Sequence, residues 1–239
     1  MASFNAGSPD VSVIIPVLAE GDRIQSLLSQ LATSADSVRY EVIVVDGDPQ
    51  GSTLRCLPPQ QLDIRGILAP RGRGSQMNAG AALARGAILL FLHADTQLPP
   101  QALPKICAAL RESSAVAGAF DLAIDSSRWI LKLIGRVSSL RSRLTRTPYG
   151  DQAIFIHRST FAKIGGYPEI PIMEDVALMR YLKRRGFAIV ILSDRTLVSP
   201  RRWEQEGVIY CTLRNWSLLL LYNLGVSPHQ LVRWYHPTS

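Results

Sequence analysis

Three short acidic segments carry the side chains best suited to chemistry. Glu41–Asp48 (EVIVVDGD) and Phe91–Thr96 (FLHADT) each end an apolar run in carboxylates, and Met173–Val176 (MEDV) opens a predicted helix. A carboxylate at a strand end can accept a hydrogen bond from a nucleotide base or a ribose hydroxyl. It can also ligate a hard divalent cation, with a diphosphate supplying further oxygens. Acids in the first turn of a helix tend to stay ionised and can accept a proton.

A sheet must position these acids. Strand-like apolar runs without polar alternation are typical of parallel sheets covered on both faces, and helices between them imply right-handed crossovers. The sequence therefore predicts an α/β fold with a doubly wound, mostly parallel sheet and helices on both faces. The predicted strands are Val11–Val17, Glu41–Val45, Ile64–Ala69, Ala87–His93, Ala115–Ile124, Asp151–His157 and Ala188–Leu192, and the main helices are Asp22–Thr33, Gly74–Arg85 and Glu174–Arg185.

Asp46 and Asp95 fall at the carboxyl ends of predicted strands. In open α/β sheets ligands bind along that edge, although an aspartate there can also simply cap a turn. Two such residues, each followed by a loop containing Gly or Pro, favour a binding site.

Two amphipathic or apolar segments of the second half allow alternative interpretations. Arg128–Arg146 keeps its apolar residues at helical spacing with basic residues between them. Packing of the apolar face on the core is the preferred interpretation, and contact with an anionic membrane surface is the alternative. Val208–Leu224 predicts a C-terminal helical extension, buried against the rest of the chain or in a homodimer, with membrane contact as the alternative.

Composition narrows the classes of function. The chain has 239 residues and a formal net charge of +7, but residues 1–127 carry 9 Lys/Arg against 12 Asp/Glu and residues 128–239 carry 17 against 7. A basic half attracts phosphates, acidic polymers or anionic lipid. No zinc-finger spacing, RNP signature or helix-turn-helix pattern supports nucleic acid as a partner. Three scattered cysteines and the absence of a signal peptide predict a cytoplasmic protein.

The chain resembles the family 2 glycosyltransferases, which have the GT-A fold. The resemblance rests on SVIIPVLAE, EVIVVDGD, GRGSQMNAGAALARGAILLFLHADT and GGYPEIPIMEDVALMRYLKRRG, in that order, and it extends from about Val11 to Trp203. The HADT variant, with YGDQAIF and SPRRWE, is similar to a soluble bacterial subfamily of poorly defined substrate.

The resemblance implies roles for individual residues. Asp175 would be the base that deprotonates an acceptor hydroxyl, and Asp95 would match the last carboxylate of the family's metal-binding DXD motif. The binding site for the nucleotide sugar and the acceptor would be lined by Pro16, Glu20, Asp46, Arg73, Asp151, Arg201, Arg202 and Trp203. Asp46 would hold the nucleotide base.

Three assignments stay open at this level. His93 stands where the first DXD acid is expected, so it is either a metal ligand beside Asp95 or a hydrogen-bonded structural residue. Either Asp46 or Asp48 would contact the nucleotide base of the donor. Glu174 is the alternative to Asp175 as catalytic base, because both begin the same predicted helix.

We expect one glycosyltransferase domain over residues 1–239. Residues 11–125 would bind the nucleotide sugar, residues 126–205 the acceptor, and residues 206–239 would form a helical tail. The predicted function is transfer of a sugar from a UDP- or GDP-type donor, with Mn²⁺ or Mg²⁺ as cofactor and with inversion. The acceptor is unidentified, and lipid-linked acceptors are among the candidates. Peripheral contact with the inner membrane face is an option. The alternatives are a sugar-1-phosphate nucleotidylyltransferase and a catalytically degenerate nucleotide-sugar-binding protein.

Overall fold

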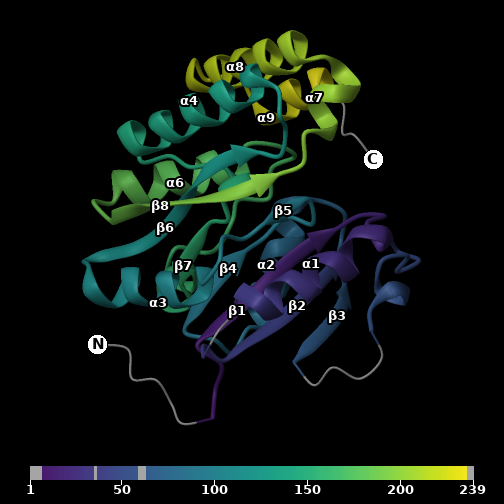
Figure 1. Ribbon diagram of the computed structural model, residues 1–239. Helices are drawn as coiled ribbons and strands as arrows, with labels where there is room; N and C mark the ends of the chain where they lie inside the picture. The colour runs from purple at the N-terminus through teal and green to yellow at the C-terminus, as the bar shows by residue number, and fades with distance from the viewer. Residues whose placement is uncertain (1–6, 35–36, 59–62, 236–239) are drawn as a thin grey trace.

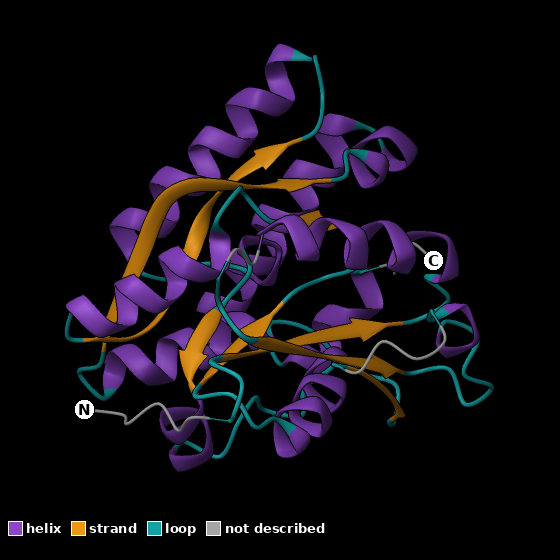
Figure 2. Cartoon of the chain, turned by 60° about the horizontal axis from the view of Figure 1, so that its bottom comes forward, coloured by secondary structure: helices purple, strands orange, loops and turns teal. Residues whose placement is uncertain are grey.

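The computed structural model describes residues 7–34, 37–58 and 63–235, and Figures 1 and 2 show the arrangement of their helices and strands. The strands are β1 (Val11–Val17), β2 (Tyr40–Asp46), β3 (Ile64–Leu68), β4 (Ile88–Phe91), β5 (Thr96–Gln97), β6 (Ala115–Ile124), β7 (Phe155–His157) and β8 (Ala188–Val198). The α-helices are α1 (Gly21–Ser34), α2 (Arg73–Leu83), α3 (Ala102–Glu112), α4 (Trp129–Thr145), α5 (Arg158–Lys163), α6 (Glu174–Arg184), α7 (Arg201–Glu206), α8 (Val208–Asn223) and α9 (Pro228–Leu231). Short 3₁₀ helices are η1 (Leu54–Cys56), η2 (Gly150–Gln152) and η3 (Val232–Trp234).

The strands form one sheet in the order β3-β2-β1-β4-β7-β6-β8-β5. The pairs among β1 to β4 are parallel, as is β6 with β8, whereas β7 and β5 run antiparallel to their neighbours. The predicted α/β class with a mostly parallel sheet is confirmed.

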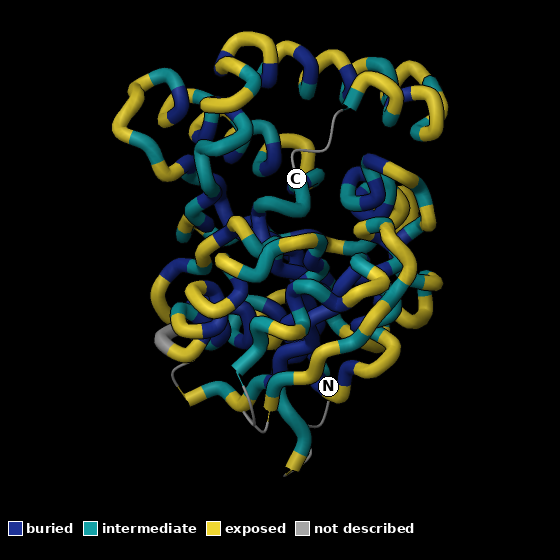
Figure 3. The backbone as a smooth tube through the Cα atoms, turned by 90° about the vertical axis from the view of Figure 1, so that its right-hand side faces the viewer, coloured by how far each residue is buried: buried dark blue, intermediate teal, exposed yellow. Residues whose placement is uncertain are grey.

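Helices cover both faces of this sheet because its strands are apolar on both sides. In β1, Val13 and Ile15 belong to the core shared with α1 and α3, while Ile14 belongs to the core shared with α2 and α6. Successive strand side chains point to opposite faces, so an uninterrupted apolar strand needs a layer on each side. Figure 3 shows the buried segments concentrated around the sheet.

The carboxyl ends of β1 and β2 are held together by one buried amide. Gln76 of α2 donates from Nε2 to the carbonyl oxygens of Val17 and Val45, both at 2.8 Å. Val17 pairs with Asp46 at the same level of the sheet. These contacts fix the edge from which the first two site loops leave.

The structure of α4 contradicts the preferred interpretation, in which the apolar face of this helix packs on the core. Five of its seven predicted core residues are exposed, with Trp129 73% and Leu144 76% accessible. Apart from the buried Leu131, the face that meets β6 is made of small residues: the Ser139 hydroxyl bonds both the N–H and the carbonyl of Leu122, and a side chain at Gly135 would press on the Leu122 carbonyl oxygen. Small residues allow the helix to approach the strand closely, so its apolar stripe points outward.

The helix α8 likewise exposes much of the surface that was predicted to be buried. Its exposed apolar side chains are Ile209, Tyr210, Leu213, Trp216 and Leu220, whereas Val208, Cys211 and Leu218 pack inward. Figure 1 shows α4 and α8 together at the top, on the opposite side of the molecule from β1 to β3. No helix of the described residues is long and apolar enough to span a bilayer.

Two predicted strands are shorter in the structure. The strand predicted from Asp151 begins only at Phe155, because residues 150–152 form η2 and Ala153 takes a left-handed conformation with φ 51°. The strand predicted to reach His93 ends at Phe91, and the N–H of Thr96 turns back to the His93 carbonyl. Asp151 and His93 therefore lie on loops beyond the sheet edge.

Candidate functional site

Asp95 lies beside the start of α7 because the two-residue strand β5 pairs with the end of β8 at the edge of the sheet. Thr96 of β5 pairs with Val198 of β8, and the N–H of Ser199 donates to the Asp95 carbonyl oxygen at 3.1 Å. The side chain of Asp95 is exposed, and its Oδ1 lies 3.5 Å from the Thr96 hydroxyl, which is a long hydrogen bond. Its carboxylate is thus open toward solvent and near Arg201–Trp203.

His93 packs against the backbone of Gly150. A side chain at position 150 would lie 2.7 Å from Cε1 and 2.8 Å from Nε2 of His93, so a residue with a Cβ could not be accommodated without a shift. Burial and the nearby charges of Arg73 and Arg202 lower the pKa of His93 to about 4, against the opposing effect of Asp95. The imidazole is therefore neutral near pH 7.

Asp175 is held in a defined orientation at the start of α6. Its Oδ2 accepts from the N–H of Gly150 at 2.7 Å, and its Oδ1 accepts from the N–H of Val176 at 2.7 Å. The side chain is only half-buried, so it can still be reached from the cleft. Met173, in a left-handed conformation with φ 68°, makes the turn that begins the helix and sets this direction.

Glu174 differs from Asp175 in its environment. It is buried, and it lies over Gly74, whose Cβ, if present, would be 3.8 Å from the Glu174 Cβ. Burial and the charge of Asp175 raise the pKa of Glu174 to about 7, although Arg73 opposes the shift. The partly exposed Asp175 is therefore the better placed of the two to meet a ligand.

Arg73 provides positive charge between the two acidic loops. It is the first residue of α2, and its side chain is exposed. Its charge interacts with those of Glu174, Asp95 and Asp175, and with Tyr235 near the C-terminus. Asp95 and Asp175, 80 positions apart in the sequence, thus share one electrostatic environment.

Asp151 sits in η2, which is tied to three other elements. Its carbonyl accepts from the Thr196 hydroxyl of β8, and the adjacent Gln152 bonds the Phe120 carbonyl and the Ser142 hydroxyl. Burial, with repulsion from Asp175 and Asp95, raises the pKa of Asp151 to about 6 against the attraction of Arg141. Its Oδ1 is buried and has no hydrogen-bond partner among the described residues.

The first loop brings Glu20 toward the same cleft. Its N–H donates to the Thr53 hydroxyl at 3.0 Å, and its carboxylate pairs with Arg23. Burial is the main cause that raises the pKa of Glu20, and its charge interacts with those of Asp95 and Arg201. Pro16 is half-buried in β1, at the end next to β2.

Asp46 requires a correction. Its side chain is 0% exposed, and its oxygens accept from the backbone N–H groups of Asp48, Thr53 and Leu54. A carboxylate with no accessible surface and three internal donors organises its own loop and cannot contact a nucleotide base in this structure. Asp48 is partly exposed. Its oxygens accept hydrogen bonds from the backbone N–H groups of Gln50 and Ser52.

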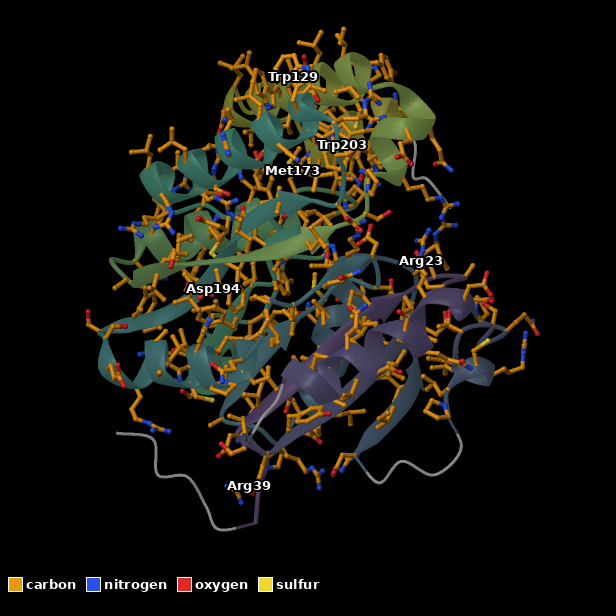
Figure 4. All side chains as sticks on the ribbon, viewed as in Figure 1. Arg23, Arg39, Trp129, Met173, Asp194 and Trp203 are labelled. Atoms are coloured by element: carbon orange, nitrogen blue, oxygen red, sulfur yellow. The ribbon has the colours of Figure 1, made fainter. Side chains whose placement is uncertain are left out.

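Arg201, Arg202 and Trp203 line the far side of the cleft. Arg202 hydrogen-bonds the Tyr235 hydroxyl, and its guanidinium lies 4.8 Å from the centre of that ring. Trp203 packs with Ile124, Leu131, Val208 and Cys211, which anchors α7 beneath α4 and α8. Figure 4 shows Trp203 below the outer surface on which Trp129 lies.

The donor set fits a cation that arrives with a diphosphate. Among the described residues, no group of three or more His, Cys, Asp and Glu side chains could hold a metal ion. The exposed Asp95 carboxylate supplies hard oxygen ligands, and the neutral His93 could add a nitrogen. Hard divalent cations need more oxygens than this, and a diphosphate would provide them.

The structure thus brings one set of ionisable side chains into interaction with one another, with Trp203 anchoring the adjacent α7: Glu20, Arg73, His93, Asp95, Asp151, Glu174, Asp175, Arg201 and Arg202. Asp46 lies at the same sheet edge but inside the protein. Sequence reasoning missed Gly150, Arg141 and Tyr235. The segment YGDQ was a sequence signal for Gly150. No sequence pattern, by contrast, links Tyr235 to Arg202, which it contacts in the structure.

Comparison with known proteins identifies related sequences. Residues 12–165 match the sequence model of glycosyl transferase family 2. The undecaprenyl-phosphate 4-deoxy-4-formamido-L-arabinose transferase of Aeromonas hydrophila is 34% identical over 116 residues, which are 45% of this chain and 36% of that protein. The dolichol-phosphate mannosyltransferase of Pyrococcus furiosus is 30% identical over 113 residues, 45% of this chain and 32% of that protein. The matched part thus spans about a third of each of these relatives.

Solved structures show the same fold. The mannosyltransferase PcManGT from Pyrobaculum calidifontis, in complex with GDP-Man and Mn²⁺, has a TM-score of 0.61 at 19% identity over 80% of this chain and 57% of that one. Residues 1–349 of S. aureus TarS in complex with UDP give a TM-score of 0.62 at 22% identity over 80% of this chain and 61% of that one. The curled, mostly parallel sheet with flanking helices is the GT-A fold.

Proposed function

The chain belongs to glycosyl transferase family 2, and on that premise we propose that it transfers a sugar from a nucleotide-sugar donor to an acceptor hydroxyl, with Asp175 as the general base. The observation that carries the proposal is the position of Asp175. It is partly exposed, it is oriented by the N–H groups of Gly150 and Val176, and it shares the cleft with Arg73 and Asp95.

The chemistry follows from this arrangement. The acceptor hydroxyl oxygen forms a bond to the anomeric carbon, and its proton passes to the Asp175 carboxylate. The bond between the anomeric carbon and the phosphate oxygen breaks, and the nucleoside diphosphate leaves with that electron pair. Because no protein nucleophile intervenes, the configuration at the anomeric carbon inverts. A correctly placed base contributes about 10²–10⁴-fold to such a step.

Positive charge around the cleft supports a diphosphate leaving group. Arg73, Arg201 and Arg202 come from two separate elements, and their charges interact with Asp95, Glu20 and His93 respectively. A divalent cation, Mn²⁺ or Mg²⁺, held by Asp95 with or without His93 would add charge stabilisation to the leaving diphosphate. We assign donor binding to residues 11–125 and acceptor binding to residues 126–205, with residues 206–239 as the tail of a single domain. Donors of UDP or GDP type are favoured because TarS and PcManGT were solved with UDP and GDP-Man.

Substitutions at the two neighbouring acids test the assignment. We expect Asp175→Asn to lower the rate of nucleoside diphosphate release from the competent donor by about 10²–10⁴-fold, because the amide cannot take the proton. The matched control, Glu174→Gln, should lose less than about tenfold, since a Glu174 with a pKa of about 7 is already about half neutral at that pH. Equal losses in both variants, or full activity in Asp175→Asn, would show that Asp175 is not the base.

We also propose peripheral contact between α4 and an anionic membrane surface. Exposed Trp129, Leu133 and Leu144 lie on the same helix as exposed Lys132 and Arg136, a combination that suits an anionic interface. The protein should therefore sediment with vesicles that contain phosphatidylglycerol and stay in the supernatant with phosphatidylcholine alone. A homodimer in solution that fails to bind either vesicle would instead assign this surface to self-association.

A further inference from the structure

A pocket of about 370 Å³ lies between α4 and α8. Most of its wall is apolar, and Leu122, Ile134, Val137, Trp216, Leu219 and Leu220 contribute to it. Arg141, Tyr149, Asp151, Trp203 and Thr212 add polar groups to the lining. Apolar walls with a few convergent polar groups are the usual composition of a small-molecule site.

Four polar atoms of this lining lack partners. The buried Nε of Arg141, Oδ1 of Asp151, Nε1 of Trp203 and Oγ1 of Thr212 make no hydrogen bond within the described part of the chain. These are half of the eight such atoms found there, and all four belong to residues of one pocket. An unsatisfied buried polar group destabilises the folded protein, so a ligand that bonds to these atoms restores the missing hydrogen bonds.

The pocket meets the proposed catalytic base through one short segment. Tyr149 and Asp151 line the pocket, and Gly150 between them donates its N–H to Oδ2 of Asp175 at 2.7 Å. The charges of Asp151 and Arg141 also interact with that of Asp175. A molecule in the pocket therefore has one end next to the segment that orients Asp175.

The charge of this end selects against a phosphate. Of the residues that line the pocket, only Arg141 and Asp151 are charged, and the charge of Asp151 also interacts with those of Asp175, Asp95 and Arg73 outside the lining. Arg141 is partly engaged: its guanidinium lies 3.3 Å from the centre of the Tyr149 ring and its Nη2 donates to the Ser142 hydroxyl, while its Nε has no partner among the described residues. A phosphate dianion would meet carboxylate repulsion with little compensation, whereas a hydroxyl can donate to Asp151 and accept from Thr212 or Trp203.

We infer that this pocket is the acceptor site and that it takes an uncharged alcohol attached to an apolar body, held at its hydroxyl end by Asp151 and Thr212. This inference rests on the proposed transfer function and adds the acceptor class to it. The site differs in this respect from the two curated relatives, whose names specify lipid phosphates. Its apolar part lies between the same two helices that expose apolar side chains to solvent.

Two probes with one alkyl chain separate the alternatives. We would titrate the full-length protein with n-octyl β-D-glucoside and with octyl phosphate, both below their micelle concentrations, by tryptophan fluorescence and calorimetry. The wild type should bind the glucoside at least about tenfold more tightly than the phosphate, because like charges brought together cost more than the 1.4 kcal/mol that tenfold represents. Octyl phosphate that binds equally well or better would overturn the inference.

Variants localise the binding. Asp151→Asn should reduce the preference for the glucoside by about tenfold, because it removes the repelling charge. Thr212→Val, which keeps the shape of the side chain, should weaken glucoside binding several-fold, and it tests the pocket even if Asp151→Asn does not fold. Thr160→Val in α5, outside the pocket, is the matched control and should bind as the wild type does. If all three variants bind the glucoside alike, the pocket is not its site.

Nucleotide binding by the same samples separates this inference from the proposed function. UDP or GDP binding in the presence of Mn²⁺, combined with no preference for the alcohol, would overturn the acceptor assignment alone. Absence of nucleotide binding would instead count against sugar transfer itself.

Discussion

Apolar side chains are buried in β1, β2 and β4 of the sheet, whereas many are exposed on α4 and α8. Leu90 of β4 is 0% exposed in the core that it shares with α1, whereas Leu144 of α4 is 76% exposed. The N-terminal half is slightly acidic and the second half strongly basic. The two regions meet at the cleft, where Asp95 comes from the first and Asp151 and Asp175 come from the second.

Apolar residues therefore serve two purposes in the chain. In the first region they stabilise a sheet whose carboxyl edge holds the loops of Asp46 and Asp95 in position. In the second they form a surface and a pocket whose walls are available to another molecule. We therefore expect substitutions in the first region to act on folding and substitutions in the second to act on binding.

The largest expected effect on stability is that of Leu90→Ala. It removes a fully buried side chain from the sheet core and should lower the free energy of unfolding by about 2–5 kcal/mol. Leu144→Ala, the same substitution on exposed α4, should change it by less than about 0.5 kcal/mol. Urea unfolding of both variants measures the difference. Similar losses in the two would mean that α4 is packed against something that covers it, and the contrast between the regions would be lost.

A smaller effect is expected where the regions meet, at Glu174. Its pKa is raised to about 7 by burial, so the folded state holds a proton that the unfolded chain, with a pKa near 4.5, releases earlier. Stability should therefore fall as the pH rises from about 4.5 through 7 and level off above that. The expected loss is about 1–3 kcal/mol, and Glu174→Gln should not show it.

Denaturant unfolding of the wild type and of Glu174→Gln at pH 5 and pH 8 measures this term. The difference in stability between the two proteins should shift in favour of the variant at the higher pH. A shift of the opposite sign would mean that Glu174 is ionised in the folded protein, and the distinction between Glu174 and Asp175 would not hold.

The sequence predicted the first region well for a physical reason. Strand β1 spans Val11–Val17 as predicted, and β2 extends the predicted strand by one residue at each end. Continuous runs of Val, Ile and Leu bounded by polar residues leave few alternatives to a buried parallel strand. Once the strands are known, Asp95 is placed at the carboxyl edge by the topology alone.

The second region was harder because distant side chains decide its conformation. The 3₁₀ helix η2 replaces the first residues of the predicted strand Asp151–His157, and it depends on Gln152 bonding to Ser142 and to the Phe120 carbonyl. In α4 the apolar periodicity correctly predicted a helix, but small residues such as Ser139 make the contact with β6. Periodicity identifies the apolar face of a helix and does not reveal whether that face is covered.

The buried state of Asp46 has the same explanation. Its position at a strand end was predictable, whereas its three backbone donors come from residues 48, 53 and 54, and the loop that brings them back is not visible as a pattern. The predicted contact of Asp46 with a nucleotide base is not possible in this structure, because the local fold buries the side chain against three backbone N–H groups.

Calorimetric titration with UDP and GDP, with and without Mn²⁺, tests the central claim most directly. If the cleft holds a cation-bridged diphosphate, at least one nucleotide binds the wild type, Mn²⁺ tightens that binding by about tenfold or more, and Asp95→Ala abolishes the effect of Mn²⁺ while the protein remains folded. Failure of both nucleotides to bind, or a Mn²⁺ effect that is unchanged in Asp95→Ala, would contradict the account.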